Sequence, residues 1–255
     1  MTNRLVEPKW PNDYSFASSY AATWHSSRKN SFIASILKKA SENMVRLAAP
    51  ISGIWVDVGC GAGAILPTLL RHSTRIVGID TDPAKISDAS ALTRNMFGAV
   101  HACVASAYSL PFRDGVVDGV MCAETLEHVD ERSALAEIRR VLKPAGRFIF
   151  AIPVESGTAL LLRETFRRIL SLSRTNFSTM GYTAKELIEH SVLGRDRENH
   201  VTKRQPSPWN HRFFSYAELL SRIEEQRFRI EQLRWSPLPL RGPWSSDIVG
   251  VAVPS

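Results

Sequence analysis

The chain has 255 residues, of which 44% are hydrophobic and 22% are charged, and its formal net charge at pH 7 is +7. This length and composition exclude a disordered chain and predict one large α/β domain, alone or with a sizeable insertion. Because no apolar run of about 18 residues is present to span a bilayer and residues 1–15 lack the apolar core of a secretory signal, we expect a cytoplasmic protein.

From residue 51 onward, short β-rich runs alternate with helix-like segments, which is the pattern of a mostly parallel sheet covered by helices. The predicted strands cover residues 53–60, 75–80, 100–106, 115–123, 147–153, 229–235 and 247–254. The predicted helices cover residues 64–72, 82–97, 131–142 and 215–228. We expect the third helix to be stopped by Lys143, Pro144 and Gly146.

Basic residues predominate in residues 1–52 and 163–255, whereas the segment between them is mildly acidic. Such flanks could contact an anionic substrate, an acidic membrane surface or nucleic acid, but a solvated basic face is commoner. The cysteines are Cys60, Cys103 and Cys122, all in strand-like segments without metal-type spacing. They predict buried reduced thiols, and no metal site is expected.

The segment WVDVGCGAGA (55–64) is a glycine-rich turn that follows the first predicted strand. Asp57, Gly59, Gly61 and Gly63 form D-x-G-x-G-x-G, yet Gly59, Gly61 and Ala64 also satisfy the loose dinucleotide pattern G-x-G-x-x-A. Glycines let the backbone approach a ligand closely. An acid such as Asp80, at the end of the second strand, can accept ribose hydroxyls of either ligand type, so these residues alone do not decide between a dinucleotide and S-adenosylmethionine.

Two downstream segments decide between these ligands. They are SLPFRDGVVDGVMCAETLEHV (109–129) and EIRRVLKPAGRFIFAIP (137–153). Together they resemble class I S-adenosylmethionine-dependent methyltransferases, especially the branch that contains the ubiquinone-biosynthesis O-methyltransferases, although Ala145 stands where that family has a glycine. The resemblance implies a Rossmann-like methyltransferase fold: a doubly wound, mostly parallel seven-stranded sheet with an antiparallel last strand. It also implies S-adenosylmethionine as cofactor and S-adenosylhomocysteine as product.

The resemblance carries cofactor roles to individual residues. Gly59, Gly61 and Gly63, preceded by Asp57, would wrap the methionine part. Asp80 would bind the ribose, Thr81 would lie against the adenine, and Ala123 would give backbone contacts near the sulfonium. The family usually has Asp-Ala after the third strand, whereas this chain has Ser106 and Ala107. A serine hydroxyl accepts a hydrogen bond but carries no charge, so we expect adenine to be held more weakly or through water.

His128 is the candidate general base because it follows the fourth strand, at the edge where open α/β sheets bind ligands. The alternative is that His128 packs and forms hydrogen bonds at the start of its helix. Glu124 and Glu127 could orient the histidine, but carboxylates near a helix start are more often caps.

The resemblance and the breaks in regularity divide the chain into four parts. They are an N-terminal helical cap (1–50), a cofactor-binding core (51–153), a lid or substrate insertion (154–210) and a C-terminal completion of the sheet (211–255). Phe16, Tyr20 and Trp24 have helical spacing in the cap, which either packs onto the core or closes as a lid. Residues 157–177 predict a basic amphipathic helix, preferred as a lid, with peripheral membrane contact as the alternative. The oligomeric state is not predicted.

The leading functional hypothesis is methylation of a small, hydrophobic molecule, and the resemblance implies oxygen as the acceptor atom. Carbon or nitrogen methylation of a small molecule is the next alternative. Methylation of nucleic acid or protein follows, prompted by the basic flanks but disfavoured because the segment after the fourth strand reads CAET and lacks an amino-methylating motif. A nonenzymatic cofactor-binding protein and a dehydrogenase are weaker alternatives.

Overall fold

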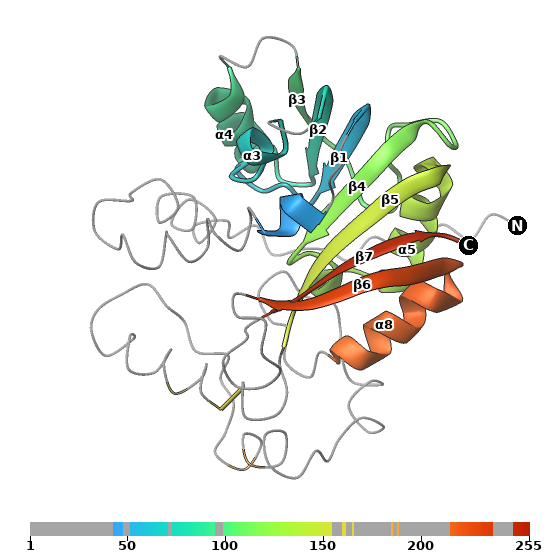
Figure 1. Ribbon diagram of the computed structural model, residues 1–255. Coiled ribbons are helices and arrows are strands. Elements are labelled where there is room, and N and C mark those ends of the chain that lie inside the picture. The colour runs from blue at the N-terminus through green and yellow to red at the C-terminus, as the bar shows by residue number, and fades with distance from the viewer. Residues whose placement is uncertain are drawn as a thin grey trace, which may run out of the picture.

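The computed structural model describes residues 43–47, 52–70, 73–94, 99–154, 160–161, 165, 185, 188, 215–236 and 247–255. Its strands are β1 (Ile54–Val58), β2 (Arg75–Asp80), β3 (Val100–Val104), β4 (Val117–Ala123), β5 (Leu142–Pro153), β6 (Phe228–Ser236) and β7 (Asp247–Pro254). Its helices are α3 (Leu66–Leu70), α4 (Pro83–Thr93), the 3-10 helix η1 (Leu126–His128), α5 (Glu131–Val141) and α8 (Tyr216–Glu225). Figure 1 shows these elements arranged around one twisted sheet.

The strands form one seven-stranded sheet in the order β3-β2-β1-β4-β5-β7-β6. The pairs β1–β2, β2–β3, β1–β4 and β4–β5 are parallel, and β7 runs antiparallel to both β5 and β6. The predicted mostly parallel sheet of seven strands with an antiparallel last strand is therefore confirmed. The position of β7 between β5 and β6 depends on contacts between distant parts of the chain, which the pattern of strands along the sequence does not reveal.

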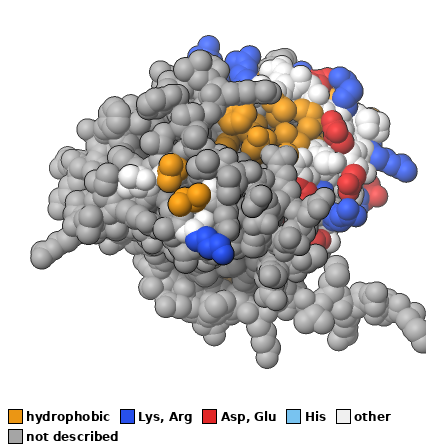
Figure 2. Space-filling view, turned by 90° about the horizontal axis from the view of Figure 1, so that it is seen from below, with side chains coloured by type: hydrophobic (Ala, Val, Ile, Leu, Met, Phe, Trp, Pro, Cys, Tyr) orange, Lys and Arg blue, Asp and Glu red, His pale blue; other side chains and the backbone are white. Residues whose placement is uncertain are grey.

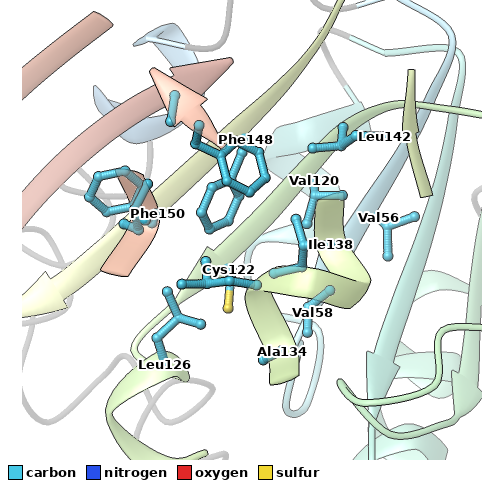
Figure 3. Packing of buried hydrophobic residues seen from close by; sticks show 14 of the residues in the cluster. Val56, Val58, Val120, Cys122, Leu126, Ala134, Ile138, Leu142, Phe148 and Phe150 are labelled. Atoms are coloured by element: carbon cyan, nitrogen blue, oxygen red, sulfur yellow. The ribbon is translucent and has the colours of Figure 1, made fainter. Parts of the chain in front are cut away.

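Helices cover both faces of the sheet, because successive strand residues point to opposite sides. Val56 and Val58 belong to a core that also includes residues of α5 and α8, and Figure 3 shows part of this packing around Ile138 and Phe148. Trp55 belongs to a second core formed with residues of α3, α4 and helical residues 43–47. The two cores confirm the doubly wound arrangement.

Local signals explain where three helices begin. The Asp82 side chain accepts a hydrogen bond from the Ala84 amide at 2.9 Å, and Pro83 occupies the first turn of α4. Asp130 caps α5 and Ser215 caps α8 in the same way. Ion pairs from Arg222 to Glu131 and from Arg132 to Glu225 then join α8 to α5.

Several predicted boundaries of strands and helices were wrong, and three helices show the physical reason most clearly. Helix α3 begins at Leu66, because turns closed by hydrogen bonds between residues three apart, from Gly63 N–H to Cys60 C=O and from Leu66 N–H to Gly63 C=O, occupy the preceding segment. Helix α4 ends at Thr93. Helix α5 ends at Val141, and the residues expected only to stop it belong to β5, which starts at Leu142 and shifts register against β4 before Gly119.

Several predictions concern residues outside the described ranges. Phe16, Tyr20 and Trp24 lie outside them, and so does most of residues 157–177, of which 160, 161 and 165 are described. The cap of residues 1–50 and the insertion of residues 154–210 therefore stay predictions. Among the described residues, no helix combines the length and apolar character needed to cross a bilayer.

Candidate cofactor and substrate site

The candidate site lies at the carboxyl ends of β1 and β4, where the strand order changes direction. From β1 the chain proceeds to β2 and β3 on one side, and then crosses to β4 and β5 on the other. Open α/β sheets bind ligands at such switch points, outside the carboxyl ends of the strands (Figure 1). The glycine loop leaves β1 here, and the segment containing η1 leaves β4 beside it.

The glycine loop leaves an open space beside Gly61. Gly61 has a φ of 53°, and a Cβ added there would meet no atom of the described residues within 4 Å. Gly59 has a φ of 78°, and a Cβ on it would overlap the side chain of Thr125 on the loop after β4. Gly59 thus lets the two loops pack together, while Gly61 exposes bare backbone to a ligand.

Asp80 is held rigidly next to this loop. Its Oδ2 accepts a hydrogen bond from the Gly61 amide at 3.0 Å, and its Oδ1 accepts one from the Asp82 amide at 3.0 Å. Lys85 Nζ lies 3.8 Å from Oδ2. Because each carboxylate oxygen can accept a second hydrogen bond, Asp80 is both fixed and able to bind hydroxyl groups. The neighbouring Thr81 is exposed.

Asp57 lies at the start of the same loop and is almost completely buried. Its side chain is 2% exposed, and no described residue donates a hydrogen bond to its Oδ2. Burial, and then the negative charge of Asp80, raise the pKa of Asp57 to about 7. A buried acid without a partner, at the mouth of an open glycine loop, fits a cationic ligand.

The neighbouring thiols are not suited to nucleophilic chemistry. Burial raises the pKa of Cys60 and Cys122, with further contributions from nearby acids such as Asp57. Cys103 is partly buried, and burial raises its pKa as well. All three cysteines are free, so the prediction of reduced thiols is confirmed, with Cys103 less buried than expected.

The segment after β3 is tied to both sides of the site. The Ala105 amide donates to the Asp80 carbonyl at 3.1 Å, which joins it to β2. Ser106 Oγ accepts from the Tyr108 amide at 3.2 Å. The Tyr108 hydroxyl accepts from the Asp130 amide at 2.8 Å, which joins the segment to the start of α5. Ser106 and Ala107 are partly buried here.

The loop after β4 presents Ala123 and His128 at the switch point. Thr125 Oγ1 donates to the Ala123 carbonyl at 3.0 Å, and the His128 amide donates to the Thr125 carbonyl at 3.0 Å. The His128 side chain is 24% exposed, and its Nε2 lies 3.8 Å from Oε1 of Glu127, which is 1% exposed. His128 is therefore partly exposed at the switch point, with the buried carboxyl group of Glu127 near its ring.

Sequence reasoning missed Thr125 and Tyr108. Thr125 lies inside the quoted CAETLEHV segment, and its hydroxyl type is the signal that could have found it. Tyr108 carried no signal, because its partner Asp130 is distant in the sequence. Glu124, by contrast, is exposed and has a φ of 51°. It lies in the turn after β4, before η1 begins, and not in a helix with His128.

The surface seen from below Figure 1 is mixed in character. Figure 2 shows a larger patch of hydrophobic side chains, with acidic and basic side chains to one side of it, and a smaller hydrophobic group apart from it. Within the described ranges, no group of three or more His, Cys, Asp or Glu side chains is arranged to hold a metal ion.

Comparison with known proteins adds independent findings. The family described as "Methyltransferase domain" matches residues 56–150. The "O-methyltransferase resE" of Aspergillus sclerotiorum is 35% identical, over 54% of this chain and 65% of that protein. The "Ubiquinone biosynthesis O-methyltransferase" of Sodalis glossinidius is 30% identical, over 38% of this chain and 39% of that protein. The chain therefore spans less than two thirds of the length of each of these relatives.

Solved structures show the same fold at low sequence identity. A TehB-like SAM-dependent methyltransferase from Corynebacterium glutamicum superposes with a TM-score of 0.59 and 16% identity, covering 94% of this chain and 99% of that one. A SAM-dependent methyltransferase from Aquifex aeolicus gives the same TM-score of 0.59, with 16% identity. At this identity the likeness concerns the fold alone.

Proposed function

We propose that the protein methylates an oxygen atom of a small, hydrophobic molecule, with S-adenosylmethionine as the methyl donor. The match of residues 56–150 to the family described as "Methyltransferase domain" supports methyl transfer. The observation that carries this proposal is the pairing of an open glycine loop with a tethered Asp80 and a buried, unpartnered Asp57. The O-methyltransferase relatives support oxygen as the acceptor atom.

The cofactor would lie across the carboxyl ends of β1, β2 and β3. We assign its methionine part to Gly59, Gly61, Gly63 and Asp57, its ribose to Asp80, its adenine to Thr81, Ser106 and Ala107, and the surroundings of its sulfonium to Ala123. Two hydrogen bonds support this placement of the cofactor across the three strand ends. The Gly61 amide donates to the Asp80 side chain, which joins the ends of β1 and β2, and the Ala105 amide donates to the Asp80 carbonyl, which joins the ends of β3 and β2. Ser106 gives the adenine end an uncharged acceptor.

A bound S-adenosylmethionine would supply the methyl group, and S-adenosylhomocysteine would be the leaving group when the acceptor oxygen bonds to the methyl carbon. The chain's own task is to align the two reactants and exclude water, which can lower the barrier by several kcal/mol. We assign His128 to take the proton of the acceptor hydroxyl as the oxygen–methyl bond forms. The Glu127 carboxyl group, 3.8 Å from His128 Nε2, would stabilise the imidazolium that results.

Cofactor identity is tested by calorimetry with S-adenosylmethionine, S-adenosylhomocysteine and NAD. We expect the first two to bind and NAD not to bind. An Asp80→Asn variant should bind the nucleosides at least about 10-fold more weakly, because a charged acceptor of hydroxyl hydrogen bonds contributes about 1.5–3 kcal/mol. Preference for NAD would overturn the proposal.

The acceptor atom is tested by incubating the protein with methyl-labelled cofactor and matched phenols, carboxylic acids and amines. Release of S-adenosylhomocysteine with label on an oxygen supports the proposal, whereas label on carbon or nitrogen would replace it by the corresponding alternative. RNA, DNA and protein serve as further acceptors in the same assay. Labelling of a macromolecule in preference to every small molecule would reject the small-molecule assignment.

The role of His128 is tested by His128→Ala with cofactor binding measured in parallel. We expect turnover to fall by about 100-fold or more at unchanged cofactor affinity, since general base catalysis contributes about 10²–10⁴-fold. A loss below about 10-fold would remove His128 as the base and favour the packing role. Cofactor binding is the control for correct folding of the site.

A further inference from the structure

Thr125 holds the loop after β4 in an unusual way. It occupies the position before η1, where a threonine side chain ordinarily caps the helix, yet among the described residues of this loop it makes no capping hydrogen bond. Its hydroxyl group instead donates back to the Ala123 carbonyl at 3.0 Å, and its own carbonyl accepts from the His128 amide at 3.0 Å. Thr125 therefore ties together the main chain from the end of β4 to His128.

The same side chain lies directly over Gly59, the first glycine of the glycine loop. A Cβ added to Gly59 would overlap the Oγ1, Cγ2 and Cβ atoms of Thr125. Thr125 thus fills the place that any other residue at position 59 would need for its own side chain. The glycine loop is held against β2, because the Gly59 amide donates to the Ile79 carbonyl at 2.7 Å. The two loops are therefore fitted together by shape.

This contact begins where the hydrogen-bonded ladder between β1 and β4 ends. The last pair of that ladder is Asp57 opposite Met121. Beyond it, the glycine loop and the loop after β4 meet at the candidate site, and the Thr125 side chain packs between them. Displacement of a reacting group by about 1 Å can cost about 100-fold in rate. Thr125 is therefore placed to determine how far His128 lies from a ligand of the glycine loop.

We propose that Thr125 is a positioning residue for methyl transfer, which fixes the place of His128 relative to the cofactor. The shape of its side chain locks the loop after β4 onto Gly59, and its hydroxyl group holds the Ala123 carbonyl. No bond to Thr125 forms or breaks in the reaction. This inference rests on the proposed function, because it takes the glycine loop as the cofactor cradle and His128 as the base.

The fit between Thr125 and Gly59 is tested on the ligand-free protein by denaturant unfolding. Gly59→Ala should destabilise the unsubstituted protein through overlap with Thr125 and through the strain of an alanine at a φ of 78°. In a Thr125→Gly background the overlapping atoms are absent, and only the strain remains. We expect Gly59→Ala to change the unfolding equilibrium constant at least about 5-fold less in that background. Equal changes in the two backgrounds, or loss of folding in both, would overturn the inference.

The hydroxyl group is tested by a pair of conservative substitutions. Thr125→Val keeps nearly the same shape against Gly59 but cannot donate to Ala123, whereas Thr125→Ser keeps the donor. We expect Thr125→Val to bind S-adenosylhomocysteine within about 3-fold of the unsubstituted protein and to lower kcat by about 10-fold or more. Thr125→Ser should restore kcat to within about 3-fold. Turnover is measured with methyl-labelled S-adenosylmethionine and the phenol that takes most label in the acceptor assay.

Three comparisons separate positioning from a general loss of structure. Thr74→Val removes a hydroxyl group that donates to the Gly53 carbonyl at 2.9 Å, at the amino ends of β1 and β2, and it should match the unsubstituted protein in turnover. In a His128→Ala background, Thr125→Val should lower turnover by less than about 3-fold, because effects that pass through one residue are not additive. Without any acceptor, the His128 amide should exchange its hydrogen at least about 10-fold faster in Thr125→Val than in Thr125→Ser.

The outcomes separate this inference from the proposed function. If methyl transfer occurs and Thr125→Val retains the kcat of the unsubstituted protein, the positioning role is overturned and the methyltransferase proposal stands. The same conclusion follows if Thr125→Val lowers turnover equally with and without His128. If no phenol is methylated, equal hydrogen exchange of the His128 amide in the valine and serine variants overturns the inference. If neither S-adenosylmethionine nor S-adenosylhomocysteine binds, the proposed function fails and the positioning role fails with it.

Discussion

Replacing Gly61 by alanine should weaken cofactor binding strongly at a small cost in stability. Gly61 has a φ of 53°, and an added Cβ would lie more than 4 Å from every atom in the part of the chain that the structure describes. The substitution therefore adds only the strain of a left-handed alanine, about 1–2 kcal/mol. The new methyl group points into space that we assign to the methionine part of the cofactor, where overpacking costs about 1–3 kcal/mol. That corresponds to a loss of about 5-fold to 150-fold in affinity.

Gly115 offers a matched control for this experiment. It has a φ of 64°, and an added Cβ would also meet nothing within 4 Å. It precedes β4, at the opposite end of the sheet from the glycine loop, and its amide donates to the Arg140 carbonyl at 2.9 Å. Gly115→Ala thus carries the same backbone strain without touching the candidate site.

The assay combines urea unfolding with calorimetric titration of S-adenosylhomocysteine on both variants. We expect similar losses of unfolding free energy in the two, and weakened binding in Gly61→Ala alone. Equal affinities in the two variants would show that the space beside Gly61 is not occupied by the ligand. The glycine loop would then not be the cofactor cradle, and the reasoning from the open Cβ position would be refuted.

Four further predictions follow from single contacts. The unfolding free energy of the ligand-free protein, measured with denaturant and compared with that of Asp57→Asn, should fall as the pH rises from about 4 to about 7. The pKa of Asp57 in the folded state is about 7, above the ordinary 3.8, so the folded state binds a proton that the unfolded state has lost. The full effect is on the order of 4 kcal/mol. Gly119→Ala should destabilise by about 1–3 kcal/mol, since its Cβ would overlap the Trp55 ring. Asp130→Ala should cost about 1 kcal/mol through loss of the α5 cap. Ser106→Asp should tighten S-adenosylhomocysteine binding about 5-fold or more, as a charged acceptor replaces a neutral one, and unchanged affinity would remove adenine from that position.

The glycine loop and Asp80 were predictable because their signals are local. A strand, a glycine turn and a helix follow one another within residues 54–70, and Asp80 comes directly at the end of the next strand. The end of α5 was mispredicted because Pro144 reads equally well as a helix stop and as a strand irregularity. The pairing of Val117 with Leu142 decides in favour of the strand, and that pairing is not local.

The sequence by itself determined the fold class, the seven strands, the glycine turn and the acid at the end of β2, because periodicity and turn chemistry act over short stretches of chain. Only the tertiary structure decided which groups meet. It places Thr125 against Gly59, ties Gly61 to Asp80, inserts β7 between β5 and β6, and buries Asp57 without a hydrogen bond to Oδ2. Burial and pairing depend on neighbours from distant parts of the chain, and the pKa of Asp57 is set by those neighbours.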